Sequence, residues 1–506
     1  MLPEKLSGLR GWRADLAALL FGVIAAVALP PVYGLPALAI AVPALLYLIK
    51  GADGPIVAAR RGWWFGFGLY GIGLYWITDA ILVEAARFWW LVPLAVPALA
   101  AILAFFSAVP AAVAWRARPG WRMALALSGA WVLADIARQF IATGFPWNPL
   151  GSVWEFPGRL GDIMIQPASA IGVHGLTLAT LLLASAPALN RMGRAIGLAI
   201  LVLWCGFGVV RLGQPVAPGP NLTVLLIQGN VAQGQKWDRT LMVSIFHHYL
   251  DMTQQAVAGL NGQPAVVVWP ETASPALLQT DSEARRMIAS AAGGATALVG
   301  AVRFDEAGRP RNSLFAIGAN GAIEGIYDKW HLVPFGEYQP DWLPVSLQLV
   351  PGGGFASGPG PATLHIPGLP PAGALICYEA IFSNQILDES DRPAWMVNVT
   401  NDAWFGNSAG PRQHLAAVRM RAVEEGQPAM RAANTGISAG FDAKGHELGR
   451  LAMQTTGVLA LHLPAPEPIT LYARFGLLLP ASVAATALFI GLSGTAIRQR
   501  PRSANF

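Results

Sequence analysis

Four residues in the second half of the sequence combine a thiol, two carboxylates and an ammonium, which are suited to nucleophilic catalysis. Glu271 follows one short apolar run and Cys377 ends another, while Lys329 and Glu337 stand eight residues apart in a polar and aromatic stretch between them. A thiol is a good nucleophile only as the thiolate, a nearby carboxylate can remove its proton, and an ammonium can stabilise the thiolate and a later oxyanion. The set predicts a Cys377 nucleophile with Glu271 as general base and Lys329 beside the oxyanion.

The backbone around Cys377 offers a further donor. If Cys377 lies at a strand-to-helix elbow, the amide of Tyr378 can supply a second hydrogen bond to the oxyanion. Each residue also has a plainer interpretation. Cys377 alone is more often a small buried apolar residue, Glu271 fits a surface carboxylate after a turn, and Lys329 fits a solvated loop charge. Spacing alone leaves these alternatives open.

The elements that must position these residues form an alternating pattern. Short apolar or β-branched runs bounded by Gly, Pro, Asn or Asp predict strands at 222–227, 265–269, 297–304, 313–317, 374–377, 395–399 and 436–441. Helical spacing of apolar residues predicts helices at 240–260, 282–292 and 413–425. Alternating buried strands and helices indicate a layered α/β domain.

The composition shows that this domain is only part of the chain. Of the 506 residues, 54% are hydrophobic and 12% are charged, against about 25% charged in a typical soluble domain. Residues 221–468 contain 15 basic and 21 acidic residues and carry a net charge of −6, which leaves +11 on the two flanks. Because the flanking basic residues lie between apolar runs, they are typical of membrane topology signals, and we expect no nucleic-acid binding.

The flanks hold eight apolar runs that predict eight transmembrane helices. The first two are short and interrupted by prolines, and the fifth carries Asp135 and Arg138 near its end. The runs lie at 14–29, 35–49, 62–78, 88–115, 123–137, 163–189, 195–210 and 475–497.

The basic residues assign an orientation to these helices. Fourteen of them fall at the two chain ends and in alternate loops, against three in the other short loops. By the positive-inside rule, both termini are cytoplasmic and the polar block lies outside the cytoplasm. We therefore expect a membrane domain of seven helices at 1–213, a catalytic domain at 214–468, and a last helix with a cytoplasmic tail at 469–506.

Several short motifs of the sequence resemble those of a known family. WPE at 269–271, YDKWHLVPFGEY at 327–338 and CYEAIF at 377–382 resemble the nitrilase superfamily, which has a Glu-Lys-Cys triad in this order. With the flanking apolar runs, the chain is similar to the membrane-bound branch of that superfamily, the bacterial apolipoprotein N-acyltransferases. Further matches are GFPW at 144–147, QGN at 228–230 followed by Lys236-Trp237, TNDAWFG at 400–406, PRQHL at 411–415 and NTGIS at 434–438.

The resemblance implies a periplasmic αββα sandwich, inserted into a polytopic helical protein of the bacterial inner membrane. It implies that Cys377 takes the sn-1 acyl chain of a phospholipid as a thioester. The acyl chain then passes to the α-amine of the diacylglyceryl-cysteine at the N-terminus of an apolipoprotein. Both substrates are lipids, so a site at the bilayer avoids exposing acyl chains to water, at about 0.8 kcal/mol per CH₂.

The resemblance also implies roles for neighbouring residues. Glu337 and Glu379 are supporting carboxylates: Glu337 can orient Lys329, while Glu379 is equally compatible with a structural hydrogen-bond acceptor. We expect Trp237 to bind substrate. Tyr338 and Trp404 are candidates to line the path by which substrate enters. The alternative is that they belong to a membrane-interface belt or to the ordinary core.

Two other classes of function remain to be compared with acyl transfer. A membrane-tethered amidase would share the triad but use water as the acceptor, and a transporter or scaffold would only bind. The triad argues against the scaffold and the eight flanking runs argue against the amidase. We expect a monomer that uses neither a metal ion nor a cofactor.

Overall fold

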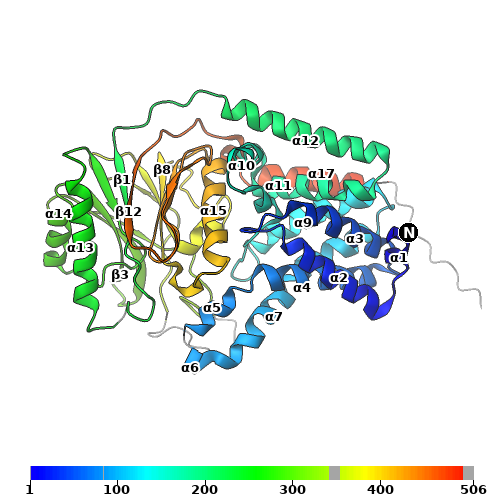
Figure 1. The fold of residues 1–506 in the computed structure, drawn as a ribbon, viewed down its shortest axis with the longest axis horizontal. Coiled ribbons are helices and arrows are strands. Elements are labelled where there is room, and N and C mark those ends of the chain that lie inside the picture. The colour runs from blue at the N-terminus through cyan, green and yellow to red at the C-terminus, as the bar shows by residue number, and fades with distance from the viewer. Residues whose placement is uncertain (1, 84, 237, 341–353, 494–506) are drawn as a thin grey trace, which may run out of the picture. The chain divides into compact units, whose positions relative to one another are not determined.

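The computed structural model describes residues 2–83, 85–236, 238–340 and 354–493 (Figure 1). The chain divides into two compact units. An apolar helical unit comprises Met1–Thr78, Phe88–Val210 and Phe475–Phe506, and an α/β unit comprises Asp79–Arg87 and Arg211–Arg474. The first unit contains the apolar runs of the sequence, and the second contains the residues that could do chemistry.

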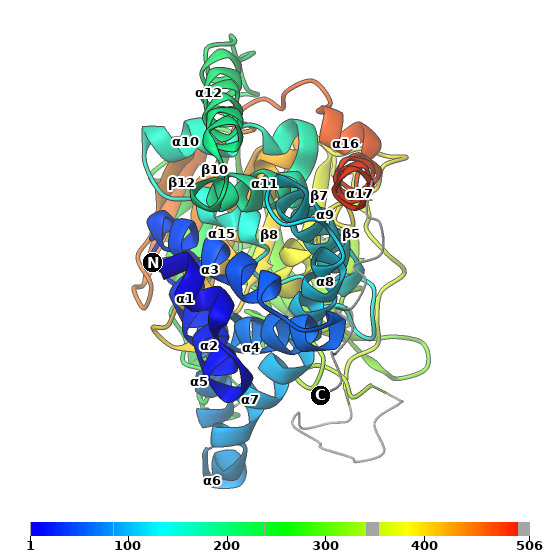
Figure 2. The ribbon, with the colours of Figure 1, turned by 90° about the vertical axis from the view of Figure 1, so that its right-hand side faces the viewer.

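The apolar unit is a bundle of helices (Figure 2). The helices approach closely where glycine removes the side chain: a Cβ on Gly22 would lie 2.0 Å from the carbonyl oxygen of Phe65, and one on Gly68 would lie 2.3 Å from that of Leu19. Small residues at such crossings are typical of helices packed in lipid. The helices are α1 (Leu2–Gly8), α2 (Gly11–Ala26), α3 (Leu38–Lys50), α4 (Pro55–Gly73), α7 (Val92–Leu103), α8 (Phe105–Trp115), α9 (Trp121–Arg138), α10 (Arg159–Ile165), α11 (Ala168–Ser185), α12 (Arg191–Leu212) and α17 (Leu478–Leu492).

Three helical segments in the described part of the chain are long and apolar enough to cross a membrane: Trp89–Trp115, Ala168–Ala188 and Arg191–Leu212. Two shorter apolar helices cover Leu35–Lys50 and Leu478–Leu492. Each of the eight expected runs contains helix. Among the described residues, only the three long segments named first have the length and hydropathy of a membrane span. The chain therefore has several apolar helices, and their number as membrane spans remains a proposal.

The α/β unit contains two six-stranded sheets with related topology. The first has the order β12-β1-β2-β3-β4-β5 and the second the order β11-β10-β9-β8-β7-β6. In each sheet the three central strands are parallel: β1 with β2 and β3, and β7 with β8 and β9. The strands are β1 (Thr223–Gln228), β2 (Ala265–Val268), β3 (Thr296–Phe304), β4 (Pro310–Ile317), β5 (Ile323–Asp328), β6 (Thr363–Leu364), β7 (Ala372–Ile376), β8 (Trp395–Thr400), β9 (Ala429–Ala433), β10 (Ala439–Phe441), β11 (Glu447–Arg450) and β12 (Gly457–His462).

The two sheets and their helices form four layers (Figure 1). A buried core between the sheets joins residues of both, such as Val224 and Val268 from the first and Ile376 and Val397 from the second. A separate core packs α13 (Met242–Ala258) and α14 (Ser282–Ala291) on the outer face of the first sheet. On the other side, α15 (Gly410–Glu425) packs against the second sheet. The expected αββα sandwich is confirmed.

The prediction of strands from the sequence was incomplete. All seven predicted runs contain a strand, but β5, β6, β9, β11 and β12 were not predicted. Strand β9 consists of three alanines, a methionine and Arg431, a composition with little β-propensity. Burial between two neighbouring strands, rather than local preference, makes it a strand.

The two ends of the α/β unit lie next to each other. The first strand and the last pair antiparallel, with Thr223 opposite His462. Beyond them, a guanidinium nitrogen of Arg211 lies 2.5 Å from a carboxylate oxygen of Glu467, and Lys444 Nζ lies 3.3 Å from the other oxygen. The main segment of this unit, Arg211–Arg474, thus begins and ends at one edge of one sheet.

Candidate active site

The three residues of the predicted triad come from three strand ends. Glu271 follows β2, Lys329 directly follows β5, and Cys377 directly follows β7 of the other sheet. All three are buried, with 6%, 1% and 8% of their surfaces exposed. The facing sheets therefore supply one carboxylate, one ammonium and one thiol from strand ends that are far apart in the sequence.

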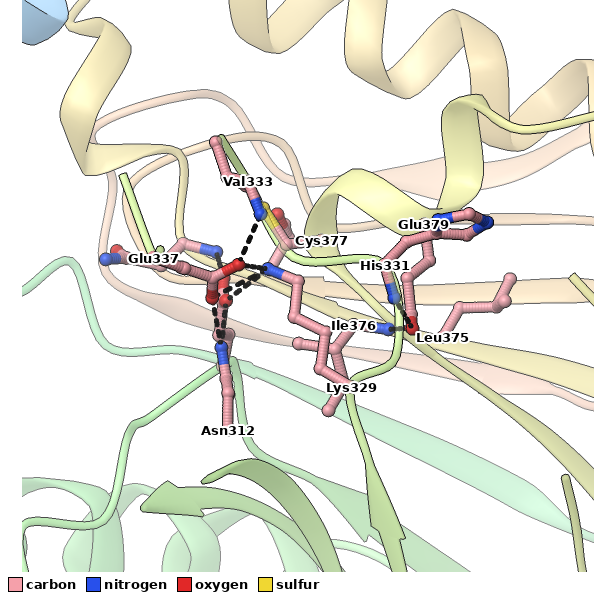
Figure 3. A network of polar contacts seen from close by, with 12 residues as sticks. Asn312, Lys329, His331, Val333, Glu337, Leu375, Ile376, Cys377 and Glu379 are labelled. Carbon is pink, nitrogen blue, oxygen red and sulfur yellow. Dashed lines mark hydrogen bonds and ion pairs between the residues drawn. The ribbon is translucent and has the colours of Figure 1, made fainter. Parts of the chain in front are cut away.

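Lys329 lies between two carboxylates. Its Nζ is 3.4 Å from Glu271 Oε1, and 2.9 Å and 2.8 Å from the two oxygens of Glu337. The second oxygen of Glu337 also accepts a hydrogen bond of 2.8 Å from the amide of Val333. Figure 3 shows the lysine and Glu337 turned toward each other beside Cys377. The structure thus brings the carboxylate of Glu337 to the ammonium of Lys329.

Two asparagines complete the environment of Glu271. The side-chain amide of Asn312, on β4, donates to Glu271 Oε1 at 2.7 Å and to Glu337 Oε1 at 2.9 Å. The main-chain amide of Asn401 donates to the other oxygen of Glu271 at 2.8 Å. One amide group thus bridges both carboxylates, and the base is held by both of its oxygens.

Burial and the charges of the site together determine the protonation state of the thiol. Burial alone would lower the pKa of Lys329, but Glu337 and then Glu271 raise it above its ordinary value. Burial raises the pKa of the Cys377 thiol, the charge of Glu271 adds to the rise, and Lys329 opposes it. The resting site therefore holds a charged lysine and a protonated thiol, which must lose its proton as it attacks.

The nucleophile sits on a strained turn. Cys377 has φ of +52°, a left-handed conformation that is uncommon for residues other than glycine, and a short 3₁₀ helix, η5 (Cys377–Ile381), begins there. The predicted elbow is therefore present. It separates the carbonyl of Cys377 from the strand ladder and presents the side chain at the end of the sheet.

Glu379 connects the elbow to the lysine loop. One of its oxygens accepts hydrogen bonds from Tyr327 Oη at 2.8 Å and from the amide of Trp330 at 2.8 Å. The other accepts from the amide of Ile376 at 2.6 Å. The side chain is fully buried, and burial raises its pKa to about 7 against the opposing hydrogen bonds. These contacts favour the structural interpretation of Glu379, because they join the backbone on both sides of the site.

A second buried lysine lies on the other side of Glu271. Lys236 is 6% exposed and its Nζ donates to the main-chain oxygen of Glu271 at 2.8 Å. Burial lowers its pKa to about 8, although the charges of Glu271 and Cys377 act in the opposite direction. In the sequence Lys236 stands out only as part of a motif, and it was not predicted as a site residue.

Three aromatic residues were predicted to bind substrate: Trp237, Tyr338 and Trp404. Tyr338 lies in the loop after β5 and accepts a main-chain hydrogen bond from Phe335 at 2.7 Å. Trp404 lies in the 3₁₀ helix η6 (Asp402–Phe405), and both side chains are partly buried. Trp237 lies outside the described residues. The role of all three in binding stays a prediction.

Comparisons with known proteins assign the chain to a family. Residues 21–186 match the model of the apolipoprotein N-acyltransferase N-terminal domain, and residues 227–466 match that of carbon-nitrogen hydrolases. An apolipoprotein N-acyltransferase of Rhodopseudomonas palustris is 37% identical, and the alignment covers 97% of this chain and 96% of the relative. The chain belongs to the apolipoprotein N-acyltransferase family.

A second relative and a solved structure are also similar to this chain. An apolipoprotein N-acyltransferase of Brucella melitensis is 39% identical over 92% of both chains. A solved structure of Nit3 of Saccharomyces cerevisiae, a nitrilase-superfamily member, is 14% identical and covers 49% of this chain and 91% of its own, with a TM-score of 0.37. The family resemblance inferred from the sequence motifs is confirmed by the full-length relatives.

The family motifs explain some residues that sequence reasoning did not assign to the site. Asn401 lies in TNDAWFG, where it holds Glu271. Asn434, of NTGIS, donates to Asn401 Oδ1 at 2.9 Å and to the main-chain oxygen of Val231 at 2.7 Å, beside QGN. These three motifs of the acyltransferase family therefore contact one another next to the general base, Glu271. Asn312 belongs to none of them, and no signal in the sequence indicates it.

Proposed function

We propose that this chain transfers the sn-1 acyl chain of a phospholipid to the N-terminal diacylglyceryl-cysteine of apolipoproteins, through a thioester on Cys377. The observation that carries the proposal is the placement of Lys329 between Glu271 and Glu337 at the elbow of a buried thiol. Membership of the apolipoprotein N-acyltransferase family favours a lipid donor and an amine acceptor over hydrolysis of small amides.

In the first step Glu271 takes the thiol proton as Cys377 Sγ attacks the ester carbonyl. The developing oxyanion is stabilised by Lys329 and the amide of Tyr378. When the carbon–oxygen bond breaks, Glu271 returns the proton to the leaving lysophospholipid oxygen. An S–C bond has then replaced the O–C bond, and the site has its original charge.

In the second step the free α-amine of the apolipoprotein attacks the thioester. Glu271 accepts a proton from the amine, and the same two donors stabilise the second oxyanion. The S–C bond breaks, and the thiolate regains the proton from Glu271. Glu337 keeps Lys329 charged and oriented, while Glu379 holds the elbow and the lysine loop together.

The proposal includes a location for the reaction. The charge pattern supports eight spans in the inner membrane, both termini in the cytoplasm, and a periplasmic catalytic domain at 214–468 between a membrane domain at 1–213 and a last span at 469–506. An alkaline phosphatase fusion after Val210 should be active and one after Arg194 inactive. The opposite pattern would invert this topology.

The reaction is tested by incubating the purified protein with a phospholipid labelled in its sn-1 chain and a diacylglyceryl-cysteine peptide. We expect a labelled thioester on Cys377 without the peptide, and one added acyl chain on the peptide amine when it is present. Cys377→Ala should form neither product. Release of free fatty acid with no peptide acylation would favour the amidase-type alternative, and a thioester elsewhere would overturn the assignment of the nucleophile.

A further inference from the structure

A second buried polar cluster contacts the main chain of the nucleophile, Cys377. His414, on α15, places Nε2 2.8 Å from the main-chain oxygen of Cys377. A carbonyl oxygen can only accept, so Nε2 carries a hydrogen and donates it. The histidine therefore contacts the backbone of the reactive cysteine and lies on an element separate from the triad.

Two charged residues, Asp402 and Arg431, hold the histidine in place. Its Nδ1 lies 3.0 Å from Asp402 Oδ1, and Arg431 Nη2 lies 2.6 Å from the other oxygen of Asp402. Arg431 also donates to Asn398 Oδ1 at 2.6 Å. His414, Asp402 and Arg431 are each at most 1% exposed. Burial would raise the pKa of Asp402, but Arg431 and His414 lower it below its ordinary value, so this carboxylate is ionised.

The elbow gives this contact a consequence for the oxyanion. The carbonyl of Cys377 and the amide of Tyr378 belong to one planar trans peptide group, so the C=O and N–H point in opposite directions. A hydrogen bond to the oxygen fixes the plane and therefore the direction of the N–H. It also polarises the group, because hydrogen bonds in series strengthen one another.

We propose that His414, held by Asp402 and Arg431, is a positioning residue that orients and polarises the Tyr378 amide for the oxyanion. The inference rests on the proposed function, in which that amide is one of two oxyanion donors. The peptide group after Cys377 lies beyond the end of β7, in the first turn of η5, and the histidine adds a buried side-chain donor to its oxygen. Without this donor, the direction of the Tyr378 amide is less firmly fixed.

The test separates oxyanion stabilisation from thiol reactivity. His414→Leu removes the donor, whereas His414→Gln retains an N–H at about the same reach. Acyl-enzyme formation from labelled phospholipid is measured in a single turnover, together with its substrate dependence. Alkylation of Cys377 by iodoacetamide, followed by mass spectrometry of the Cys377 peptide, is measured in parallel, because that displacement generates no oxyanion.

We expect His414→Leu to lower the maximal acylation rate about 30-fold, less than the loss of a whole oxyanion donor, with little change in the half-saturating phospholipid concentration. His414→Gln should recover most of the rate. Alkylation should change less than threefold in both variants.

Gln427→Met is the matched control for folding. Gln427 is also buried, and it donates to the main-chain oxygen of Pro393 at 2.6 Å, near the start of β8 and away from the elbow. The control should acylate at the wild-type rate per folded molecule, with the folded fraction taken from thermal unfolding. If His414→Leu does not fold, Asp402→Asn takes its place, because it loosens the histidine without removing it.

Two results would overturn the inference. One is wild-type acylation by folded His414→Leu, or by Asp402→Asn where it replaces that variant. The other is an equal loss of acylation and alkylation, which would indicate an effect on the thiol. A wild-type protein that forms no thioester would instead contradict the proposed function itself.

Discussion

The two sides of Glu271 hold lysines in opposite electrostatic situations. On the side of its carboxylate, Lys329 is 1% exposed, contacts two carboxylates and has a raised pKa. On the side of its main-chain oxygen, Lys236 is 6% exposed, donates to that oxygen and has a pKa lowered to about 8. Burial is similar, so the difference comes from the partners. A buried ammonium remains a fixed charge when carboxylates surround it, and becomes titratable near neutral pH when a carbonyl is its hydrogen-bond partner.

The comparison is tested most severely by Lys329→Met. The change removes the cation that faces the oxyanion and leaves Glu271 and Glu337 buried without their counter-charge, so we expect single-turnover acylation to fall by at least about 10³-fold. Lys444→Met is the matched control, because Lys444 is also buried and contacts Glu467 away from the elbow. An equal loss in both variants would show that any buried lysine is needed for folding, and that Lys329 has no special role.

A smaller effect is expected when the bridge between the carboxylates is removed. Asn312→Leu takes away the donor shared by Glu271 and Glu337, which leaves two acceptors with one hydrogen bond fewer. Both carboxylates then compete more strongly for Lys329, and we expect acylation to slow about 30-fold with Lys329 still charged.

Ser313→Ala is the control for Asn312→Leu. Ser313 neighbours Asn312 on β4, but its hydroxyl donates to Asp328 at 2.7 Å. We expect it to keep acylation within about threefold of wild type, as usual for changes away from the reacting groups. Wild-type acylation by Asn312→Leu would mean that the lysine alone keeps the two carboxylates in place.

The smallest effect on catalysis is expected for Lys236→Met, and its signature is pH-dependent stability. Between about pH 8 and the ordinary lysine pKa of 10.5, the unfolded chain binds a proton that the folded chain does not, so stability rises with pH. Below pH 8 the folded protein carries the whole cost of burying the ammonium. Lys236→Met should therefore unfold at a higher temperature than wild type at pH 7, with a difference that shrinks as pH rises through this window.

Thermal unfolding of both proteins at several pH values, followed by tryptophan fluorescence, measures this difference. Acylation by Lys236→Met should stay within about tenfold of wild type. A stability difference that grows between pH 8 and 10.5 would contradict the assignment of Lys236 as a desolvated lysine.

The sequence could predict the parts of the site that depend on local order along the chain. Glu271 and Cys377 were found because each ends a short apolar run, and parallel strands place such ends at one edge of a sheet. The elbow at Cys377 entered the sequence analysis only as a condition, and the family motifs supplied the order of the triad. Helix α15 was also predicted, because its apolar residues have helical spacing.

The residues that were missed act through contacts between distant elements. Asn312 lies inside β4 and reaches Glu271 across 41 positions, and His414 reaches the Cys377 carbonyl across 37. An asparagine in a strand or a histidine on a helix has no local signature of such a partner. Which polar side chain meets which buried acceptor depends on how the two sheets face each other, and periodicity does not contain that information.

The pairing of the first and last strands of the α/β unit has an evolutionary consequence. Thr223 opposite His462, with the Arg211–Glu467 ion pair beyond them, brings the two ends of the main segment Arg211–Arg474 close together. A segment of this kind can be inserted between two helices of another protein with little displacement of either. Because Glu271, Lys329 and Cys377 all lie within Arg211–Arg474, such an insertion carries the whole triad in one segment.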